Sequence, residues 1–272
     1  MRVREKGWKG ICILGLALAF TLLLTTSPAL AWWNESWKFR RAVTIQSDNA
    51  LGDYQILVQL NSSNFDFSKT NPDGSDIRFV DEDDTTKLNY WIEEWDNINK
   101  SAKVWVKDPT IPAGEETIYI YYNNSEAVSG SDGDAVFEFF DDFEGDLSKW
   151  TVISGTDYSI ESGLLKVIKT TDSEPRDVIR TNTLIGKEAI VEYDIKPASD
   201  SDIACAFWIK GAANEPLWIA LHKGANIYYW DGSSWTQKAS GTSYRNADQW
   251  NKEKVIFTAC LLYTSPSPRD RG

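Results

Sequence analysis

Glu192 and Asp194 give the closest approach in this sequence to a pair of catalytic carboxylates. Alternate residues of a β-strand lie on one face, and retaining glycoside hydrolysis needs two carboxyl groups about 5 Å apart. No second glutamate follows, because Lys196 and Pro197 occupy the next positions of this strand. We therefore interpret the stretch as the acidic outer face of an edge strand and predict no catalytic residues.

Aromatic side chains are the second group that could do chemistry, since sugar rings stack on exposed aromatic faces much as apolar ligands do. They crowd into one stretch of the chain: Trp208, Trp218, Tyr228, Tyr229, Trp230 and Trp235. Trp230 and Trp235 flank a turn at 231–234, and Tyr228 shares a strand face with Trp230. The hypothesis is a ligand-binding surface for glycan formed by Trp218, Tyr228, Trp230 and Trp235. The alternative is that these aromatic residues belong mostly to the core.

Acidic residues gather in two stretches, 73–84 and 132–146, and Ca²⁺ prefers oxygen ligands such as carboxylates. Neither stretch has the spacing of an EF-hand loop, which requires a glycine in its middle and a glutamate at its end. Solvated turns whose aspartates bond to the local backbone are the competing interpretation. The sequence predicts no cofactor other than structural calcium.

Histidine and cysteine are too few for other kinds of site. His222 is the only histidine, which argues against a histidine-rich metal centre and against a Ser-His-Asp triad. Of the three cysteines, Cys12 and Cys260 lie near the two ends of the chain, so the body of the protein retains Cys205 alone. We predict no intrachain disulfide, and stability must come from apolar cores.

The formal net charge of −12 limits the partners of this chain. Nucleic-acid binding is dominated by phosphate neutralisation and needs clustered Lys and Arg, which this sequence does not provide. The same charge argues against docking on an anionic lipid surface. We predict neither nucleic acid nor membrane lipid as a partner.

Residues 1–31 have the form of a secretory signal peptide. Basic residues precede an apolar run from Ile11 to about Leu24, and Ala29-Leu30-Ala31 gives the small-residue cleavage pattern. The run is shorter than the roughly 20 apolar residues that a spanning helix needs. We predict cleavage before Trp32, secretion or display at the cell surface or envelope, and no transmembrane helix in the mature chain.

Residues 260–272 need a separate explanation. The letters CLLYTSPSPRD resemble the conceptual translation of a sequencing adapter, and the preceding KVIFTA runs into them without a turn signal. A natural Ser/Pro linker is the alternative. We expect this tail to be an artefact.

Hydrophobic residues alternate with period two from Phe39 onward, which predicts an all-β protein. Strands are expected at 39–46, 54–60, 76–81, 88–95, 102–107 and 117–123, and again at intervals from 136–143 to 252–259. A stretch rich in Gly, Ser, Asn and Asp follows the first group of strands. We therefore predict two β-sandwich domains, at 32–127 and 136–259, with a linker at 128–135.

Several spaced blocks of the first half carry a family resemblance: FRRAVTI, FDFSKTNPDGSDIRFVDED, LNYWIEEWD, AKVWVK and TIYIYYNN. In this order they resemble domain of unknown function 2341, a module of exported archaeal and bacterial proteins, over about residues 32–127. The resemblance implies a β-sandwich and brings no catalytic residues with it.

The second half is similar to the concanavalin-like jelly-roll modules of lectin and laminin-G type. The blocks that carry this similarity are FEFFDDFEGDLSKW, SIESGLLKV, IVEYDIK, YYWDGSSW and WNKEKVIF. Such folds close with further strands after the last block, so the resemblance implies an incomplete jelly roll that lacks its C-terminal strands. It also implies structural calcium near the first strand, which makes Asp141 and Asp142 the expected metal ligands.

Export, two β modules and surplus aromatic residues predict a non-catalytic binding or display protein that recognises a polysaccharide or cell-wall glycan. Two alternatives stay open. The chain is a structural spacer of a large envelope protein, or it is the N-terminal fragment of a secreted polysaccharide-acting enzyme whose activity lies in a missing C-terminal part.

Overall fold

Antiparallel strands form almost all of the regular structure in a computed structural model of the chain. The structure describes residues 32–152, 156–169, 179–182, 189–196, 203–210, 216–222, 227–230, 235–239, 249–257 and 262–264. The chain divides into two units, the first ending at Phe137 and the second beginning at Glu138. The strand content of both units confirms the predicted all-β class.

The first unit is built on one six-stranded sheet with the strand order β1-β6-β3-β4-β5-β2. Its strands are β1 (Phe39–Ser47), β2 (Leu51–Asn61), β3 (Arg78–Val80), β4 (Lys87–Asp96), β5 (Ser101–Ile111) and β6 (Gly114–Tyr122). A short 3-10 helix, η1 (Phe67–Lys69), lies in the connection between β2 and β3. All six strands match predicted strands, because each alternates apolar and polar residues between clear turn signals.

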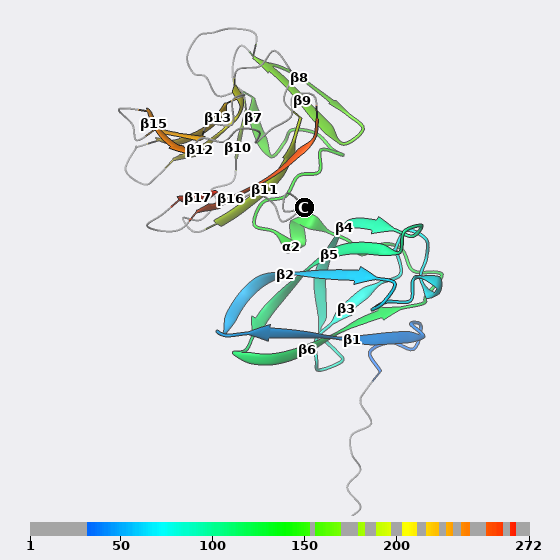
Figure 1. The fold of residues 1–272 in the computed structure, drawn as a ribbon. Coiled ribbons are helices and arrows are strands. Elements are labelled where there is room, and N and C mark those ends of the chain that lie inside the picture. Colours follow the sequence, from blue (N-terminus) through cyan, green and yellow to red (C-terminus); the bar gives the residue numbers. More distant parts are fainter. Residues whose placement is uncertain are drawn as a thin grey trace, which may run out of the picture. The chain divides into compact units, whose positions relative to one another are not determined.

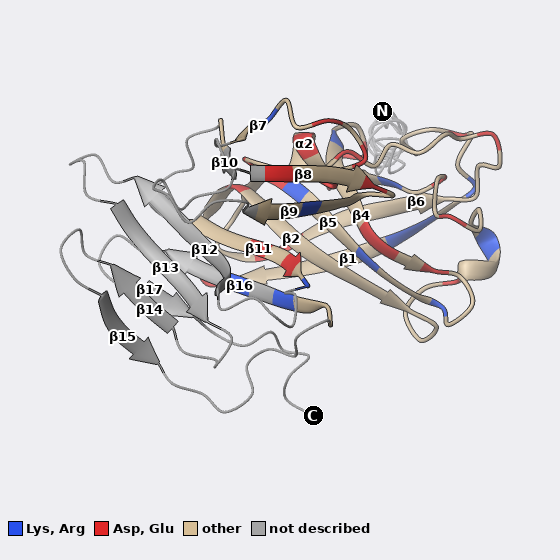
Figure 2. Cartoon of the chain, turned by 90° about the horizontal axis from the view of Figure 1, so that it is seen from above, with Lys and Arg blue, Asp and Glu red and all other residues tan. Residues whose placement is uncertain are grey.

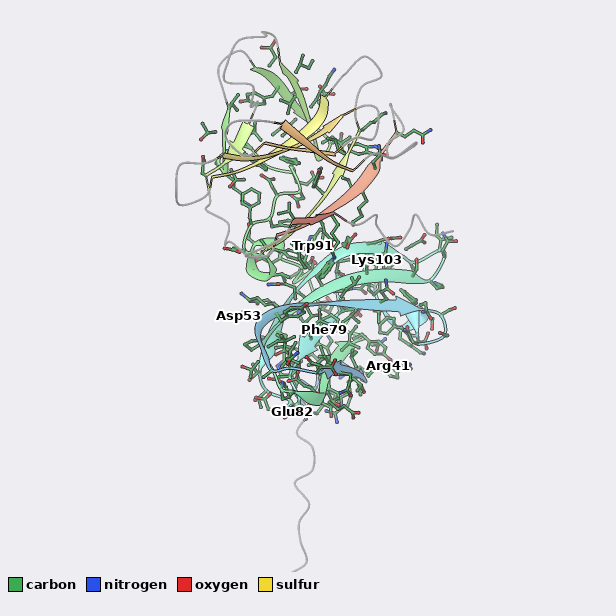
Figure 3. The ribbon with its side chains drawn as sticks, turned by 60° about the vertical axis from the view of Figure 1, so that its left-hand side comes forward. Arg41, Asp53, Phe79, Glu82, Trp91 and Lys103 are labelled. Atoms are coloured by element: carbon green, nitrogen blue, oxygen red, sulfur yellow. The ribbon has the colours of Figure 1, made fainter. Side chains whose placement is uncertain are left out.

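The sheet curls so that β1 and β6 face β2, β4 and β5 across a single core (Figure 1). Inward residues alternate along each strand: β5 buries Val104 and Val106, and β6 buries Ile118 and Ile120. Phe79 of β3 is fully buried between the two sides (Figure 3). Burying one such side chain stabilises a fold by roughly 1.5–3 kcal/mol.

The curled sheet has two ends of different composition, at opposite ends of β1 and β6 (Figure 1). The β3–β4 turn and the connection from β5 to β6 lie at one end, which we call the carboxylate end after Asp81, Asp108 and Glu116. The β2–β3 connection and the β4–β5 turn lie at the other end, which we call the groove end, with Arg41 and Lys100. The antiparallel register therefore separates the acidic group from the basic one.

Residues 128–135, which the sequence predicts as a linker, pack against the first unit. They lead into α2 (Gly133–Val136), a single helical turn that contacts β4 and β5. Val136 is fully buried, and the ring of Phe137 packs edge-on against Trp91 with ring centroids 5.7 Å apart. The strand predicted from residue 136 is wrong, because α2 ends there and no described strand follows before residue 150.

The segment before β1 covers the outer face of β6 and β3. Trp37, Val80 and Tyr121 form a second, smaller buried cluster on this face. Trp32 and Trp33 pack edge-on against the ring of Tyr121, at centroid distances of 5.3 and 5.5 Å. This cover explains why β6 is apolar on both faces near its end.

The second unit contains further strands: β7 (Trp150–Val152), β8 (Thr156–Glu161), β9 (Leu164–Lys169), β10 (Ile179–Thr181), β11 (Ala189–Ile195), β12 (Ile203–Lys210), β13 (Pro216–His222), β14 (Ile227–Trp230), β15 (Trp235–Ala239), β16 (Asn251–Phe257) and β17 (Leu262–Thr264). They form the sheets β10-β7, β8-β9, β11-β16-β17 and β12-β13-β14-β15. The sequence did not predict β8, and β17 lies within the tail that we expect to be an artefact. The concanavalin-like topology stays a prediction.

Candidate functional site

The four-stranded sheet of the second unit places three of the predicted aromatic residues in one cross-strand row. Trp218 of β13 pairs with Trp230 of β14, and Trp230 pairs with Trp235 of β15. Trp208 of β12 extends the row, because it pairs with Trp218. Directly opposed positions are the closest cross-strand neighbours in an antiparallel sheet. The backbone therefore aligns four tryptophan positions across one sheet, and we call these residues the tryptophan row.

Tyr228, the fourth predicted residue, is not part of the tryptophan row. It lies two positions before Trp230 on β14 and pairs with Ala220 and Gln237. A register irregularity between Ile227 and Tyr228 lies beside it. The side chains of all four predicted residues fall outside the part of the chain that is described, so their role in glycan binding stays a prediction.

Glu192 and Asp194, the closest approach to a catalytic pair, are exposed residues of β11. The neighbouring β16 places a lysine opposite each of them: Lys254 opposite Glu192, and Lys252 opposite Asp194. The ammonium of Lys254 lies 2.6 Å from Oε1 of Glu192. This arrangement is a surface ion pair.

Asp141 and Asp142, the predicted metal ligands, lie in the loop before β7. Asp141 accepts hydrogen bonds from the Phe143 N–H at 2.8 Å and from the Trp150 indole N–H at 2.6 Å. Asp142 accepts one from the Glu144 N–H at 3.2 Å. Within the described ranges, no group of three or more His, Cys, Asp or Glu side chains forms a metal centre. The two aspartates organise the loop, and calcium binding by them stays a prediction.

A depression of about 320 Å³ lies at the groove end of the first unit. It is lined by Arg41, Ser62, Ser63, Phe65, Asp66, Phe67, Ser68 and Lys100. These residues come from β1, from the β2–β3 connection with η1, and from the β4–β5 turn. Figure 3 shows Arg41 at this end and Asp53 at the opposite end. The sequence analysis missed this depression because three separate segments build it and none carries a recognisable motif.

The lining of the depression combines two cationic side chains, one carboxylate and three hydroxyl groups. Asp66 is engaged locally, because it accepts hydrogen bonds from the Ser68 hydroxyl at 2.6 Å and the Ser68 N–H at 3.1 Å. The bond from that hydroxyl is the main cause that lowers the pKa of Asp66. Phe65 and Phe67 are buried and form the floor. The depression therefore offers charge and hydrogen bonds to a small acidic or hydroxylated group, without an aromatic stacking face.

A charged cluster lies on the outer face of β6, next to the N-terminal segment. Arg40 and Asp84 form an ion pair, and Tyr121 donates its hydroxyl proton to Asp84 at 2.6 Å. The Arg40 guanidinium also lies over the Tyr119 ring, 4.4 Å from its centroid. Burial, together with the bond to Asp84, raises the pKa of Tyr121. Because these polar groups satisfy one another, we interpret the cluster as a structural clamp.

The charges of the described residues are otherwise scattered. Figure 2 shows lysine and arginine as separate segments interspersed with acidic ones. Among the described residues, no helix has the length and apolar character needed to cross a membrane.

Comparison with known protein families found a match to Domain of unknown function (DUF2341), over residues 73–153. The match supports the resemblance predicted for the first half, although it begins later and continues to the end of β7. Neither the curated proteins nor the solved structures contained a match to this chain. The similarity of the second half to a jelly roll stays a prediction.

Proposed function

We propose that this chain is an exported, non-catalytic module that binds a polysaccharide or cell-wall glycan. The observation that carries the proposal is the tryptophan row, which brings Trp208, Trp218, Trp230 and Trp235 from four strands into line. Neighbouring strands lie about 4.7–4.9 Å apart, a spacing that suits successive sugar rings stacked on aromatic residues at these aligned positions.

The charge of the chain narrows the class of glycan. A net charge of −12 repels polyanions over most of the surface, which favours neutral, hydroxyl-rich chains on the tryptophan row. The depression at the groove end is the local exception, because Arg41 and Lys100 lie in it together. An acidic sugar or a carboxylate side group is the ligand that this second surface suits.

The experiment is a glycan array that carries neutral and acidic polysaccharides and peptidoglycan fragments. We expect saturable binding to at least one neutral polysaccharide. Trp218→Ala and Trp230→Ala should each weaken that binding about 3- to 10-fold, because one aromatic contact contributes roughly 0.5–1.5 kcal/mol. Trp250→Ala is the matched control, since Trp250 is 55% exposed and lies outside the row. This variant should bind like the unmodified chain.

Two outcomes would contradict the proposal. One is the absence of binding to every glycan on the array, which would favour a spacer role. The other is a large loss of thermal stability in Trp218→Ala and Trp230→Ala, which would place these side chains in the core. Release of reducing sugar from a bound polysaccharide would instead support the enzymatic alternative.

A further inference from the structure

The first unit carries four Asn-X-Ser sequons, the acceptor sequence for N-linked glycosylation when X is not proline. They begin at Asn34, Asn61, Asn99 and Asn123. The sequence of the second unit contains no such sequon. An exported chain presents its sequons to glycosylating enzymes, so the structure around each asparagine amide decides which of them can react.

Three of the sequons lie at the groove end of the first unit. Asn61 ends β2 and pairs with Ser101, the last residue of the sequon at Asn99. Asn123 directly follows β6, whose end pairs with the start of β1. Asn34 lies in the N-terminal segment, beside the turn that precedes β1. All four asparagines therefore lie at turns and strand ends, where connections reach the surface.

Asn34 and Asn61 bond to their own sequons through the amide oxygen. Both side chains are exposed. Oδ1 of Asn34 accepts a hydrogen bond from the Ser36 N–H at 2.9 Å, and Oδ1 of Asn61 accepts one from the Ser63 N–H at 2.9 Å. The Ser63 hydroxyl donates to the same oxygen of Asn61. These Asx turns occupy only the oxygen, and Nδ2 of both asparagines has no partner among the described residues.

Asn99 and Asn123 instead use the amide nitrogen in the fold. Nδ2 of Asn99 donates to Oδ2 of Asp96 at 2.6 Å, within the β4–β5 turn. Nδ2 of Asn123 donates to the Lys69 carbonyl at 2.9 Å, which joins the end of β6 to η1. Asn123 is also half-buried. A sugar on either nitrogen would have to displace a hydrogen bond that the folded chain makes.

We propose that Asn34 and Asn61 are N-glycosylation sites of the folded chain and that Asn99 and Asn123 are not, a proposal that rests on the proposed export. The donor is a lipid-linked oligosaccharide, and an oligosaccharyltransferase carries out the transfer. Nδ2 forms a bond to C1 of the first sugar, the bond between C1 and the diphosphate oxygen breaks, and the lipid diphosphate leaves. The amide nitrogen gives up one proton to a base of the enzyme.

A glycan on Asn61 would lie beside the depression at the groove end. Ser62 and Ser63, the second and third residues of this sequon, are part of the lining of the depression. A bulky, solvated chain at this position hinders the entry of a large ligand. The glycosylated chain should therefore bind acidic oligosaccharides more weakly than the unmodified chain.

The test is transfer in vitro to the full, folded chain, purified from a host without N-glycosylation. The lipid-linked oligosaccharide is supplied with an oligosaccharyltransferase chosen because it modifies short peptides of all four sequons. Mass spectrometry of the glycopeptides then reports the occupancy of each asparagine. We expect occupancy at Asn34 and Asn61 to exceed that at Asn99 and Asn123 at least about tenfold, the value of one hydrogen bond.

Variants separate the sequon from the hydrogen bond. Ser63→Ala should abolish transfer to Asn61 and leave Asn34 modified. Asp96→Ala frees Nδ2 of Asn99 and should raise its occupancy about tenfold. In the same variant, Asn123 should stay unmodified, which shows that the fold is intact.

A matched control removes an acid at the other end of the first unit. Asp48 is exposed and lies in the turn between β1 and β2. Asp48→Ala should leave the occupancy of all four sequons as it is in the unmodified chain.

The proposal is overturned if the folded chain accepts no glycan at Asn34 and Asn61, or if all four sequons are modified equally. Failure of Asp96→Ala to raise the occupancy of Asn99 would contradict the role assigned to the hydrogen bond. Export is tested separately, by N-terminal sequencing of the chain recovered from the culture medium. Its failure would remove the biological setting but leave the acceptor pattern in vitro unchanged, so the two failures are distinguishable.

Discussion

The two ends of the first unit differ in whether their charged side chains are exposed or buried. At the groove end, Arg41 and Lys100 border an open depression; Arg41 is exposed, and the Lys100 ammonium donates a hydrogen bond to Asn97 at 3.1 Å. At the carboxylate end, Asp108 and Glu116 terminate the buried rows and lack partners for one oxygen each. Both ends belong to the same sheet. The difference in exposed charge therefore comes from the residues placed at each end and not from the strand order. Charge at the open end is available for binding, whereas a negative charge on the buried acids costs stability until a proton neutralises it.

The clamp formed by Arg40, Asp84 and Tyr121 pairs its buried acid, unlike Asp108 and Glu116. Breaking this clamp should change the free energy of unfolding more than any other substitution considered. Arg40→Met leaves the buried carboxylate of Asp84 without its cation. We expect the free energy of unfolding to fall by about 3–5 kcal/mol, as measured by urea denaturation. The double variant Arg40→Met/Asp84→Asn should recover part of this loss. A loss below about 1 kcal/mol for the single variant would show that pairing matters little for buried acids here.

Removing the charge of Glu116 should have a smaller effect of the opposite sign. At pH 8, Glu116→Gln should raise the free energy of unfolding by about 1–3 kcal/mol. The pKa of Glu116 is about 7 in the folded chain and 4.5 ordinarily, so the folded state holds this proton more tightly. Its contribution to stability is therefore complete below about pH 4.5 and is lost as the pH rises to about 7.

The measurement is the free energy of unfolding of the unmodified chain and of Glu116→Gln between pH 4 and pH 8. The free energy of unfolding of Glu116→Gln should equal that of the unmodified chain near pH 4 and should exceed it increasingly as the pH rises. An advantage that is equal at all pH values would show that Glu116 keeps its ordinary pKa and that the two ends do not differ as described.

At the groove end, the smallest change in stability is expected. Arg41→Ala should change the free energy of unfolding by less than about 0.5 kcal/mol, because Arg41 is exposed. It should weaken binding of acidic oligosaccharides about tenfold, the value of one charge-assisted hydrogen bond. Lys87→Ala, at an exposed position of the other end, is the matched control and should leave this binding unchanged. Equal losses for both variants would indicate general charge attraction instead of a site.

The strands were predictable from the sequence because their period is two and because their turns carry strong signals. The turn at Asn71 to Gly74 is an example, since Gly74 adopts a positive φ of 71° and its N–H bonds to the Asn71 carbonyl at 3.0 Å. The predicted linker at 128–135 also makes tertiary contacts, which its polar composition does not reveal. The residues just beyond it, Val136 and Phe137, anchor it to the first unit.

The candidate sites were predictable only in part. The sequence indicated which tryptophans lie near a turn, but their alignment depends on the pairing register of β12 with β13, which sequence patterns do not specify. Asp108 and Glu116 escaped notice because strand patterns contain many exposed acids. Only the alternation of buried positions in the folded sheet shows that these two face inward. The depression at the groove end depends on three segments that only folding brings together.

The central claim, that the tryptophan row binds a glycan, is tested most directly by oxidising the tryptophans with N-bromosuccinimide. Mass spectrometry then reports oxidation at each position, with and without the polysaccharide that binds most strongly on the array. The account predicts that Trp218, Trp230 and Trp235 are oxidised in the free chain and protected by the polysaccharide, while Trp250 is oxidised in both conditions. Two results would contradict the claim. One is equal oxidation of Trp218, Trp230 and Trp235 with and without the polysaccharide, and the other is resistance of all three to oxidation in the free chain.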